Sequence, residues 1–222
     1  MGRTRITIVR HGETEWNVLL KLQGQLDSEL TPLGLDQARA AARILQYRKF
    51  DKLIVSDLPR VINTTKEINA YHNLELNLEP GLRERNFGIM ESMTRDQVKV
   101  KFPETYEGYM TRNPEYQVPE GESLIQFYNR VINTYDKIAV ENEGLSVLTV
   151  AHGGVLDCII RRVFNMKLDE PRKYRLYNGS INAITVQDGI WMLDEWGTID
   201  HGDDIKPKDE LATLEVQRAK QG

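Results

Sequence analysis

The sequence predicts an α/β fold of three layers, α/β/α, in which helices cover both faces of a mixed, mostly parallel central sheet. In the first half of the chain, short β-branched apolar runs alternate with amphipathic helical stretches, an order typical of parallel βαβ units. This order breaks at about residues 89–120, a polar stretch with Met, Tyr and Pro residues that indicates a small, mostly helical cap. Asp188-Gly189 then separates two apolar runs, a pattern typical of an antiparallel hairpin.

Each expected strand is a short apolar run that ends at turn residues. The first, residues 5–10, is rich in β-branched residues and stops at His11-Gly12. A second covers 51–56, and a third is the short run 76–78. The remaining strands are expected at 146–151, 181–187 and 190–195.

Amphipathic periodicity predicts four helices that pack on this sheet. Pro32 and Pro59 stand in the first turns of two of them, where the fixed φ of proline favours a helix start. A third helix follows Ser123, and the fourth follows Gly154. The expected ranges are 33–47, 59–70, 124–142 and 155–164.

The composition fits a single globular domain over residues 1–222, with the cap at about 89–120 and a charged tail at about 197–222. Hydrophobic residues make up 40% of the chain and charged residues 28%, which are ordinary values for a globular protein. The formal net charge of −4 argues against a general nucleic-acid or anionic-membrane binder, because such binders rely on a positive field. We therefore expect any anion site to be local.

Three features predict a cytoplasmic protein with no membrane partner. The single cysteine, Cys158, excludes an intrachain disulfide and lies in an apolar run typical of a buried thiol. The N-terminus becomes polar too early for a signal peptide. No apolar stretch approaches the ~18 residues of a membrane span. The hairpin at 181–195 offers a sheet edge that could pair across a two-fold axis, so we also expect a homodimer.

Two histidines follow predicted buried strands directly: His11 after 5–10 and His152 after 146–151. A lone histidine at a strand end is more often structural, but two in equivalent positions favour a functional pair. Ligands of open parallel sheets bind at the carboxyl ends of the strands, so the two imidazoles would converge if their strands are neighbours. A neutral imidazole is a competent nucleophile near pH 7.

The residues beside the two histidines suit an anion. Gly12, Gly153 and Gly154 let backbone N–H groups approach a ligand closely, and a helix that starts at Gly153 would point its positive end toward the anion. Arg10 adds a planar guanidinium that matches phosphate oxygens. Two histidines and arginines around a phosphate group require no metal.

These residues carry a resemblance to a known family. The run from Val9 to Asn17, with Arg10-His11-Gly12, resembles the signature of the histidine phosphatase, or phosphoglycerate mutase-like, superfamily. Further blocks agree in order and spacing, and together they span residues 6 to 186. These blocks are 23–24, 30–34, 56–60, 82–84, 87–88, 121–123 and 151–154.

The resemblance implies a phosphate pocket of Arg10, His11, Arg60 and His152, in which His11 is phosphorylated and His152 is protonated while phosphate is bound. Glu84 matches the family's acid/base position, which protonates the departing oxygen and then activates water. Phosphoryl transfer requires mainly positioning and fixed cations, so no metal and no cofactor are expected. The residues that would assist are Asn17, Gln23, Gly24, Arg85 and Gly153.

The implied activity is a metal-independent phosphomonoester hydrolase acting on a small-molecule substrate, with two alternatives. The resemblance places Thr-Gly in phosphoglycerate mutases of the superfamily where this chain has Gln23-Gly24, and Asn where it has Gly154. Both differences favour hydrolysis. Arg85 favours a mutase, because it could meet a substrate carboxylate. A non-catalytic phospho-ligand binding module is the third hypothesis, since a fold does not fix a function.

Two groups of residues outside the motif have weaker assignments. Substrate choice is expected to reside in the cap, although packing is the more common role for most of its residues. The charged tail holds His201, Asp203 and Asp204, which lack the closed ligand set of a structural metal site. The cap residues considered for substrate contact are Tyr106, Tyr109, Met110, Arg112 and Tyr116.

Overall fold

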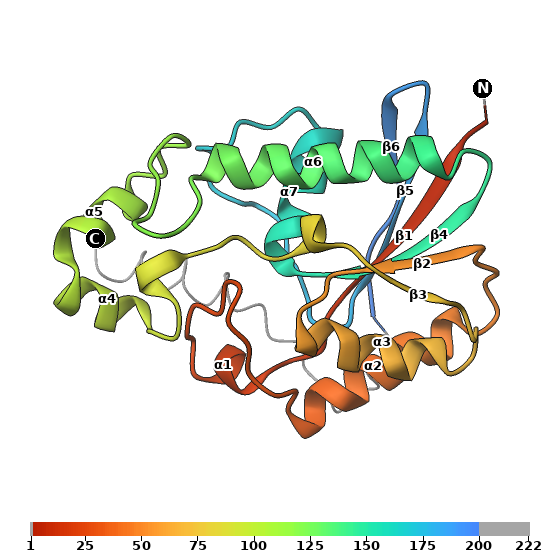
Figure 1. The fold of residues 1–222 in the computed structure, drawn as a ribbon, viewed down its shortest axis with the longest axis horizontal. Helices are drawn as coiled ribbons and strands as arrows, with labels where there is room; N and C mark the ends of the chain where they lie inside the picture. Colours follow the sequence, from red (N-terminus) through yellow and green to blue (C-terminus); the bar gives the residue numbers. More distant parts are fainter. Residues whose placement is uncertain (1, 200–222) are drawn as a thin grey trace.

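A six-stranded sheet forms the centre of the computed structural model, which describes residues 2–199 (Figure 1). The strand order is β3-β2-β4-β1-β5-β6. The first four strands along the chain pair in parallel, and the last two run antiparallel, so the predicted mixed sheet is confirmed. The strands are β1 (Thr4–Arg10), β2 (Lys52–Val55), β3 (Leu76–Leu78), β4 (Ser146–Ala151), β5 (Ile181–Gln187) and β6 (Ile190–Thr198).

The final hairpin departs from the sequence prediction at one end. Asp188 and Gly189 both have positive φ, at 52° and 75°, as a two-residue hairpin turn requires. β6 continues to Thr198, three residues beyond the expected end, because its pairing with β5 reaches Ile181 through a register shift. Residues 197 and 198, which the sequence analysis placed in the charged tail, therefore belong to β6, and His201 with its acidic neighbours lies outside the described residues.

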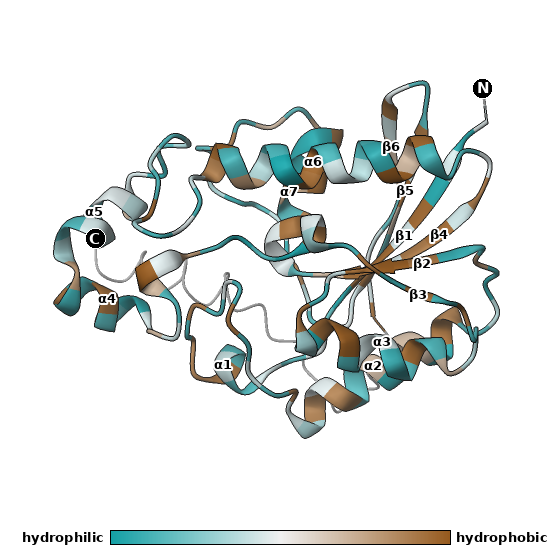
Figure 2. Cartoon of the chain, in the orientation of Figure 1, coloured by the Kyte–Doolittle hydropathy of each residue, from teal (hydrophilic) through white to brown (hydrophobic). Residues whose placement is uncertain are grey.

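Helices cover both faces of the sheet, as Figure 1 shows. The helices α2 (Pro32–Leu45) and α3 (Pro59–Asn69) pack on one face, and α6 (Leu124–Glu141) and α7 (Gly153–Val163) pack on the other. Figure 2 shows the contrast in hydropathy between the mostly hydrophobic central strands and the mixed helices. No helix between residues 2 and 199 combines the length and apolar character needed to cross a bilayer.

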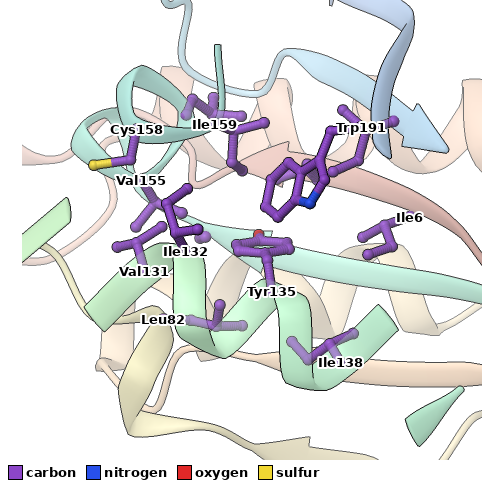
Figure 3. Close-up of a cluster of buried hydrophobic side chains, with 14 of the residues drawn as sticks. Ile6, Leu82, Val131, Ile132, Tyr135, Ile138, Val155, Cys158, Ile159 and Trp191 are labelled. Carbon is purple, nitrogen blue, oxygen red and sulfur yellow. The ribbon is translucent and has the colours of Figure 1, made fainter. Parts of the chain in front are cut away.

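Side chains of β1 pack into two separate hydrophobic cores, one on each face of the sheet. Ile6 and Ile8 pack toward α6 and α7, whereas Val9 packs toward α2 and α3. The first core includes the fully buried Tyr135, which meets the edge of Trp191 at a ring distance of 6.2 Å (Figure 3). Cys158 lies in the same core at 2% exposure, as the sequence predicted.

The predicted cap at about residues 89–120 forms short helices around a small hydrophobic core of its own. Figure 1 shows α4 (Arg95–Lys101) and α5 (Pro103–Met110) at the left, next to the start of α6. The 3-10 turns η1 (Pro80–Leu82) and η2 (Gly88–Met90) precede them. We did not predict the one-turn helix α1 (Glu15–Val18), which a capping box between Thr14, the residue before the helix, and Asn17 stabilises.

Candidate active site

The two predicted histidines lie side by side because their strands are neighbours. β1 pairs with β4 in a register that places Arg10 opposite Ala151, so His11 and His152 leave the sheet together. Their ring centroids are 5.3 Å apart in an edge-to-face arrangement. Their exposed fractions are 4% and 0%. The strand order thus supplies the convergence that the sequence alone left open.

His11 presents an unprotonated ring nitrogen to the site. Its Nδ1 lies 2.7 Å from the carbonyl oxygen of Gly12, which can only accept, so Nδ1 carries the proton. Burial, followed by the charges of Arg60 and Arg10, lowers the pKa of His11 well below its ordinary value. The imidazole is therefore neutral near pH 7, and the lone pair of Nε2 is available for attack.

His152 lies deeper, as the residue that caps the start of α7. Its Nε2 is 2.9 Å from the hydroxyl of Ser56, which follows β2, and its buried Nδ1 has no partner among residues 2–199. Burial and the charges of Arg60 and His11 lower its pKa well below the ordinary value. A bound phosphate would supply negative charge that favours the protonated form of His152. Protonation of His152 on phosphate binding stays a prediction. Ser56 belongs to a family block, but we did not predict its contact with His152.

Arg60 is a buried cation held by the loop that follows α1. It lies in the first turn of α3, which begins at Pro59, and it is 1% exposed. Its guanidinium donates to the carbonyl oxygens of Gly24 and Leu26 at 2.8 and 2.7 Å and to Asp27 Oδ1 at 2.9 Å. Burial lowers its pKa, while Asp27 opposes that change.

Arg10 is the second buried cation of the inner site. It is the last residue of β1, is 7% exposed and donates to the carbonyl oxygen of Leu176. A Cβ atom at Gly153 would lie 3.2 Å from Arg10 Nε, so the start of α7 packs directly against this guanidinium. Two guanidinium groups and a helix N-terminus therefore surround His11, which is the arrangement that an anion requires.

Glu84 lies between η1 and η2, and two backbone N–H groups hold its half-buried carboxyl group. Oε2 accepts from the N–H of Gly154 at 2.9 Å, and Oε1 accepts from the N–H of Arg85 at 2.8 Å. The backbone oxygen of Glu84 accepts from Arg130 at 3.1 Å. The predicted acid/base residue thus enters the site from a loop fastened to α6 and points at the start of α7.

These residues line an open pocket of about 250 Å³. Every predicted site residue lines it except His152, which lies behind the pocket wall. The cap contributes Tyr109, Arg112 and Tyr116, as expected. Tyr106 instead packs in the core of the cap, and Met110 does not line the pocket.

Asn17 and Gln23 hold the loop between β1 and α2 in place. The Oδ1 atom of Asn17 accepts from the N–H and the hydroxyl of Thr14, each at 3.0 Å. The Nε2 atom of Gln23 donates to the same hydroxyl at 2.7 Å. Gly24 has a φ of 54°, and a Cβ atom there would lie 1.9 Å from Glu91. Their predicted contacts with phosphate stay predictions.

The outer part of the pocket holds the cations Arg85, which the sequence analysis named, and Arg95, which it did not. Arg85 and Arg95 approach the ring of Tyr109 at 5.7 and 5.8 Å. Arg85 also donates twice to the carbonyl oxygen of Glu122, and burial lowers its pKa. Across residues 2–199, neither guanidinium has a carboxylate oxygen within 4.0 Å. We missed Arg95 because only the folding of the cap brings it to the pocket.

Within the same described range, no group of three or more His, Cys, Asp or Glu side chains is arranged to hold a metal ion. Three more charged lining residues, Asp157, Arg161 and Arg172, come from α7 and the loop after it, and Lys21 follows α1. Arg161 is 1% exposed and pairs with Asp157 at 2.8 Å, one helical turn away. Tyr174 donates to the other oxygen of Asp157 at 2.5 Å, so both carboxylate oxygens of Asp157 are hydrogen-bonded.

Comparisons with known proteins agree with this geometry. The family model of the histidine phosphatase superfamily (branch 1) matches residues 6–199. A probable phosphoglycerate mutase from Proteus mirabilis is 30% identical over 214 residues, which cover 96% of this chain and 99% of that protein. The phosphoserine phosphatase of Entamoeba histolytica, solved with 3-phosphoglyceric acid, is 27% identical with a TM-score of 0.78, over 89% of this chain and 98% of that one. A mycobacterial glucosyl-3-phosphoglycerate phosphatase is 27% identical with a TM-score of 0.75, over 88% and 99%.

Proposed function

The chain belongs to the histidine phosphatase superfamily, and we propose that within it the protein is a metal-independent phosphomonoester hydrolase. The observation that carries the proposal is the state of His11, a buried neutral imidazole with a free Nε2 between two buried arginines. This combination supplies a nucleophile and the fixed positive charge that a phosphoryl group needs.

Hydrolysis would proceed in two balanced steps. In the first, Nε2 of His11 attacks phosphorus, the P–N bond forms, the P–O bond to the leaving group breaks, and Glu84 protonates the departing oxygen. In the second, the Glu84 carboxylate takes a proton from water, whose oxygen attacks phosphorus and releases inorganic phosphate from His11. Arg10, Arg60 and protonated His152 would stabilise the equatorial oxygens in both steps, which leaves a metal ion without a required role.

The outer pocket supports a small substrate with a second acidic group. Arg85 and Arg95 face the same aromatic ring of Tyr109 without a carboxylate partner among residues 2–199. A guanidinium pair of this kind favours a carboxylate or a second phosphate. Phosphoserine and 3-phosphoglyceric acid, named for the Entamoeba histolytica structure, each combine a phosphate with a carboxylate.

A phosphoglycerate mutase is the second candidate, favoured by Arg85 in the pocket and by the similarity to the probable phosphoglycerate mutase of Proteus mirabilis. A mutase returns the phosphoryl group to a second hydroxyl instead of passing it to water. The two candidates share the first chemical step and differ only in the acceptor. A binding module without catalysis is the third, and the intact set of His11, Glu84 and His152 argues against it.

The test measures phosphate release from para-nitrophenyl phosphate and from a panel of phosphomonoesters in the presence of EDTA. A parallel assay follows the isomerisation of 3-phosphoglycerate. His11→Ala is the test variant, and His72→Ala is the matched control, since His72 lies outside the pocket. Release that depends on His11 supports the hydrolase, and isomerisation without release supports the mutase. Neither activity would favour the binding module, and strong loss with EDTA would contradict the metal-free mechanism.

A further inference from the structure

We propose that Gly154 is a positioning residue for Glu84, whose carboxyl group it directs through its N–H group and through its lack of a side chain. The proposal rests on the acid/base role given to Glu84 in the proposed function. It assigns to the start of α7 a second task besides anion binding, which is to aim the proton donor at the leaving oxygen.

Gly154 makes a direct hydrogen bond with the carboxyl group. Its N–H lies in the first turn of α7, where backbone donors have no partner within the helix. It donates to Oε2 of Glu84 at 2.9 Å, while the N–H of Arg85 fixes Oε1 at 2.8 Å. The two donors come from different segments, so together they set the plane of the carboxyl group.

A side chain at position 154 would occupy the space of this carboxyl group. A Cβ atom there would lie 2.1 Å from Oε1 of Glu84 and 2.9 Å from Cδ, closer than real Cβ contacts allow. The obstacle is the end of a flexible side chain, so the helix can stay in place while the carboxyl group turns away. At Gly12 the obstacle is the backbone of Gly34 at 2.2 Å, which cannot turn away in this manner.

The backbone of Glu84 has little freedom to follow its side chain. Arg130 on α6 donates to the carbonyl oxygens of Gly81, Arg83 and Glu84 at 2.9, 3.0 and 3.1 Å. Glu122 holds Arg130 through two contacts of 2.8 Å. Because these hydrogen bonds fix the loop, the clash of a methyl group at position 154 with Glu84 would be relieved by rotation of the carboxyl group. That rotation breaks the hydrogen bond to the N–H of residue 154.

A misdirected Glu84 would affect both proton transfers of the proposed mechanism, but kcat/KM reports only the first, because it covers the steps up to release of the leaving group. Attack by His11 and binding of the phosphoryl group do not use the carboxyl group. Protonation of the leaving oxygen does, and its importance depends on the leaving group: para-nitrophenolate departs without a proton, whereas an alkoxide requires one. Substitution of Gly154 should therefore make the rate depend more strongly on the leaving group of the substrate.

The experiment compares wild type, Gly154→Ala, Glu84→Gln and the double variant on para-nitrophenyl phosphate and on β-glycerol phosphate. For Gly154→Ala we expect kcat/KM on the alkyl ester to fall ~10²-fold or more, and on the aryl ester by less than ~10-fold. The double variant should lose little beyond Glu84→Gln, because both changes remove the same proton transfer. Inhibition by inorganic phosphate and the melting temperature should stay close to wild type.

Equal losses on both esters, or unchanged kinetics, would overturn the proposal, and so would independent, additive losses in the double variant. Melting curves distinguish a damaged fold from a displaced carboxyl group. If wild type hydrolyses neither ester, the proposed function itself fails, which is a separate outcome from failure at Gly154.

Discussion

The inner and outer parts of the pocket are built in different ways. The inner part lies where β1, β2 and β4 end, and its polar side chains, such as His11, His152 and Arg60, are almost fully buried. The outer part consists of short cap helices and loops, and its cations contact aromatic rings. Burial lowers the pKa of both histidines, and hydrogen bonds hold these histidines and Arg60 to neighbouring residues, so the inner part favours one reaction. The outer part combines Arg85, which is held by two hydrogen bonds to a backbone carbonyl oxygen, with Arg95 beside Tyr109, and this positive charge suits the selection of an acidic substrate.

The largest effect is expected from the removal of an inner cation. Arg60→Ala should lower kcat/KM for para-nitrophenyl phosphate about 10²- to 10³-fold, because the buried positive charge that acts on His11 is lost. It would also leave Asp27 unpaired, so melting temperature must be recorded alongside the kinetics. A loss below tenfold in a folded variant would show that the inner part is less specialised than we infer.

The inner part should also be the less tolerant of added volume. Gly12→Ala would place a Cβ atom 2.2 Å from the carbonyl oxygen of Gly34, where two backbones meet. We expect the free energy of unfolding to fall by about 1–3 kcal/mol, as in other overpacked sites. Gly153→Ala is the matched comparison for stability, because its nearest contact is a side-chain atom at 3.2 Å. Urea denaturation measures both, and equal stabilities would contradict the prediction.

The buried histidines should make stability depend on pH. Their pKa values are lowered in the folded protein, whereas in the unfolded chain they take up protons below about 6.5. The unfolded state then binds more protons, so this stability is complete above pH 6.5 and is lost as the pH falls toward the folded-state values. His152→Gln removes one such group. Its free energy of unfolding, measured without phosphate, should fall less steeply than that of wild type, by about 1.4 kcal/mol per pH unit. Parallel slopes would mean that His152 does not titrate in this way.

The smallest effect should come from the outer part, and it should fall on one class of substrate. Arg95→Gln is expected to raise KM about tenfold for phosphomonoesters that carry a carboxylate, because a charge-assisted contact is lost. The same variant should leave para-nitrophenyl phosphate hydrolysis within twofold of wild type. Lys66→Gln, on the exposed side of α3, is a charge-matched control. A similar loss of activity on both substrates would contradict the assignment of substrate selection to the outer part.

The helices that cover the sheet, the strands and the two strand-end histidines could be predicted because they are encoded locally, whereas Arg60 and Glu84 were implied only by the family resemblance. Strand and helix ranges follow from apolar periodicity and from Pro32 and Pro59 at helix starts, and the histidines follow their strands directly. The order of the strands could not be predicted, since pairing between β1 and β4 joins residues about 140 positions apart. Proximity of His11 and His152 therefore required the structure.

The outer site could be predicted only in part: Arg85 and the cap residues Tyr109, Arg112 and Tyr116 line the pocket as expected, whereas Arg95 reaches it only after the cap folds. Arg95 begins a short helix and carries no signal in its neighbours, and its approach to Tyr109 depends on the packing of α4 against α5. The contact of Ser56 with His152 was missed for a related reason. Ser56 appeared in a recognised block, but a hydroxyl does not reveal which distant ring it will meet.

The cap has a core separate from that of the sheet, formed by Met90, Val98 and Val118 with the aromatic residues around them. Its packing is therefore largely independent of the two cores that hold the strands and their histidines. For laboratory evolution, this means that a library confined to the pocket-facing cap residues can explore new substrates while the fold and the phosphoryl chemistry are inherited unchanged.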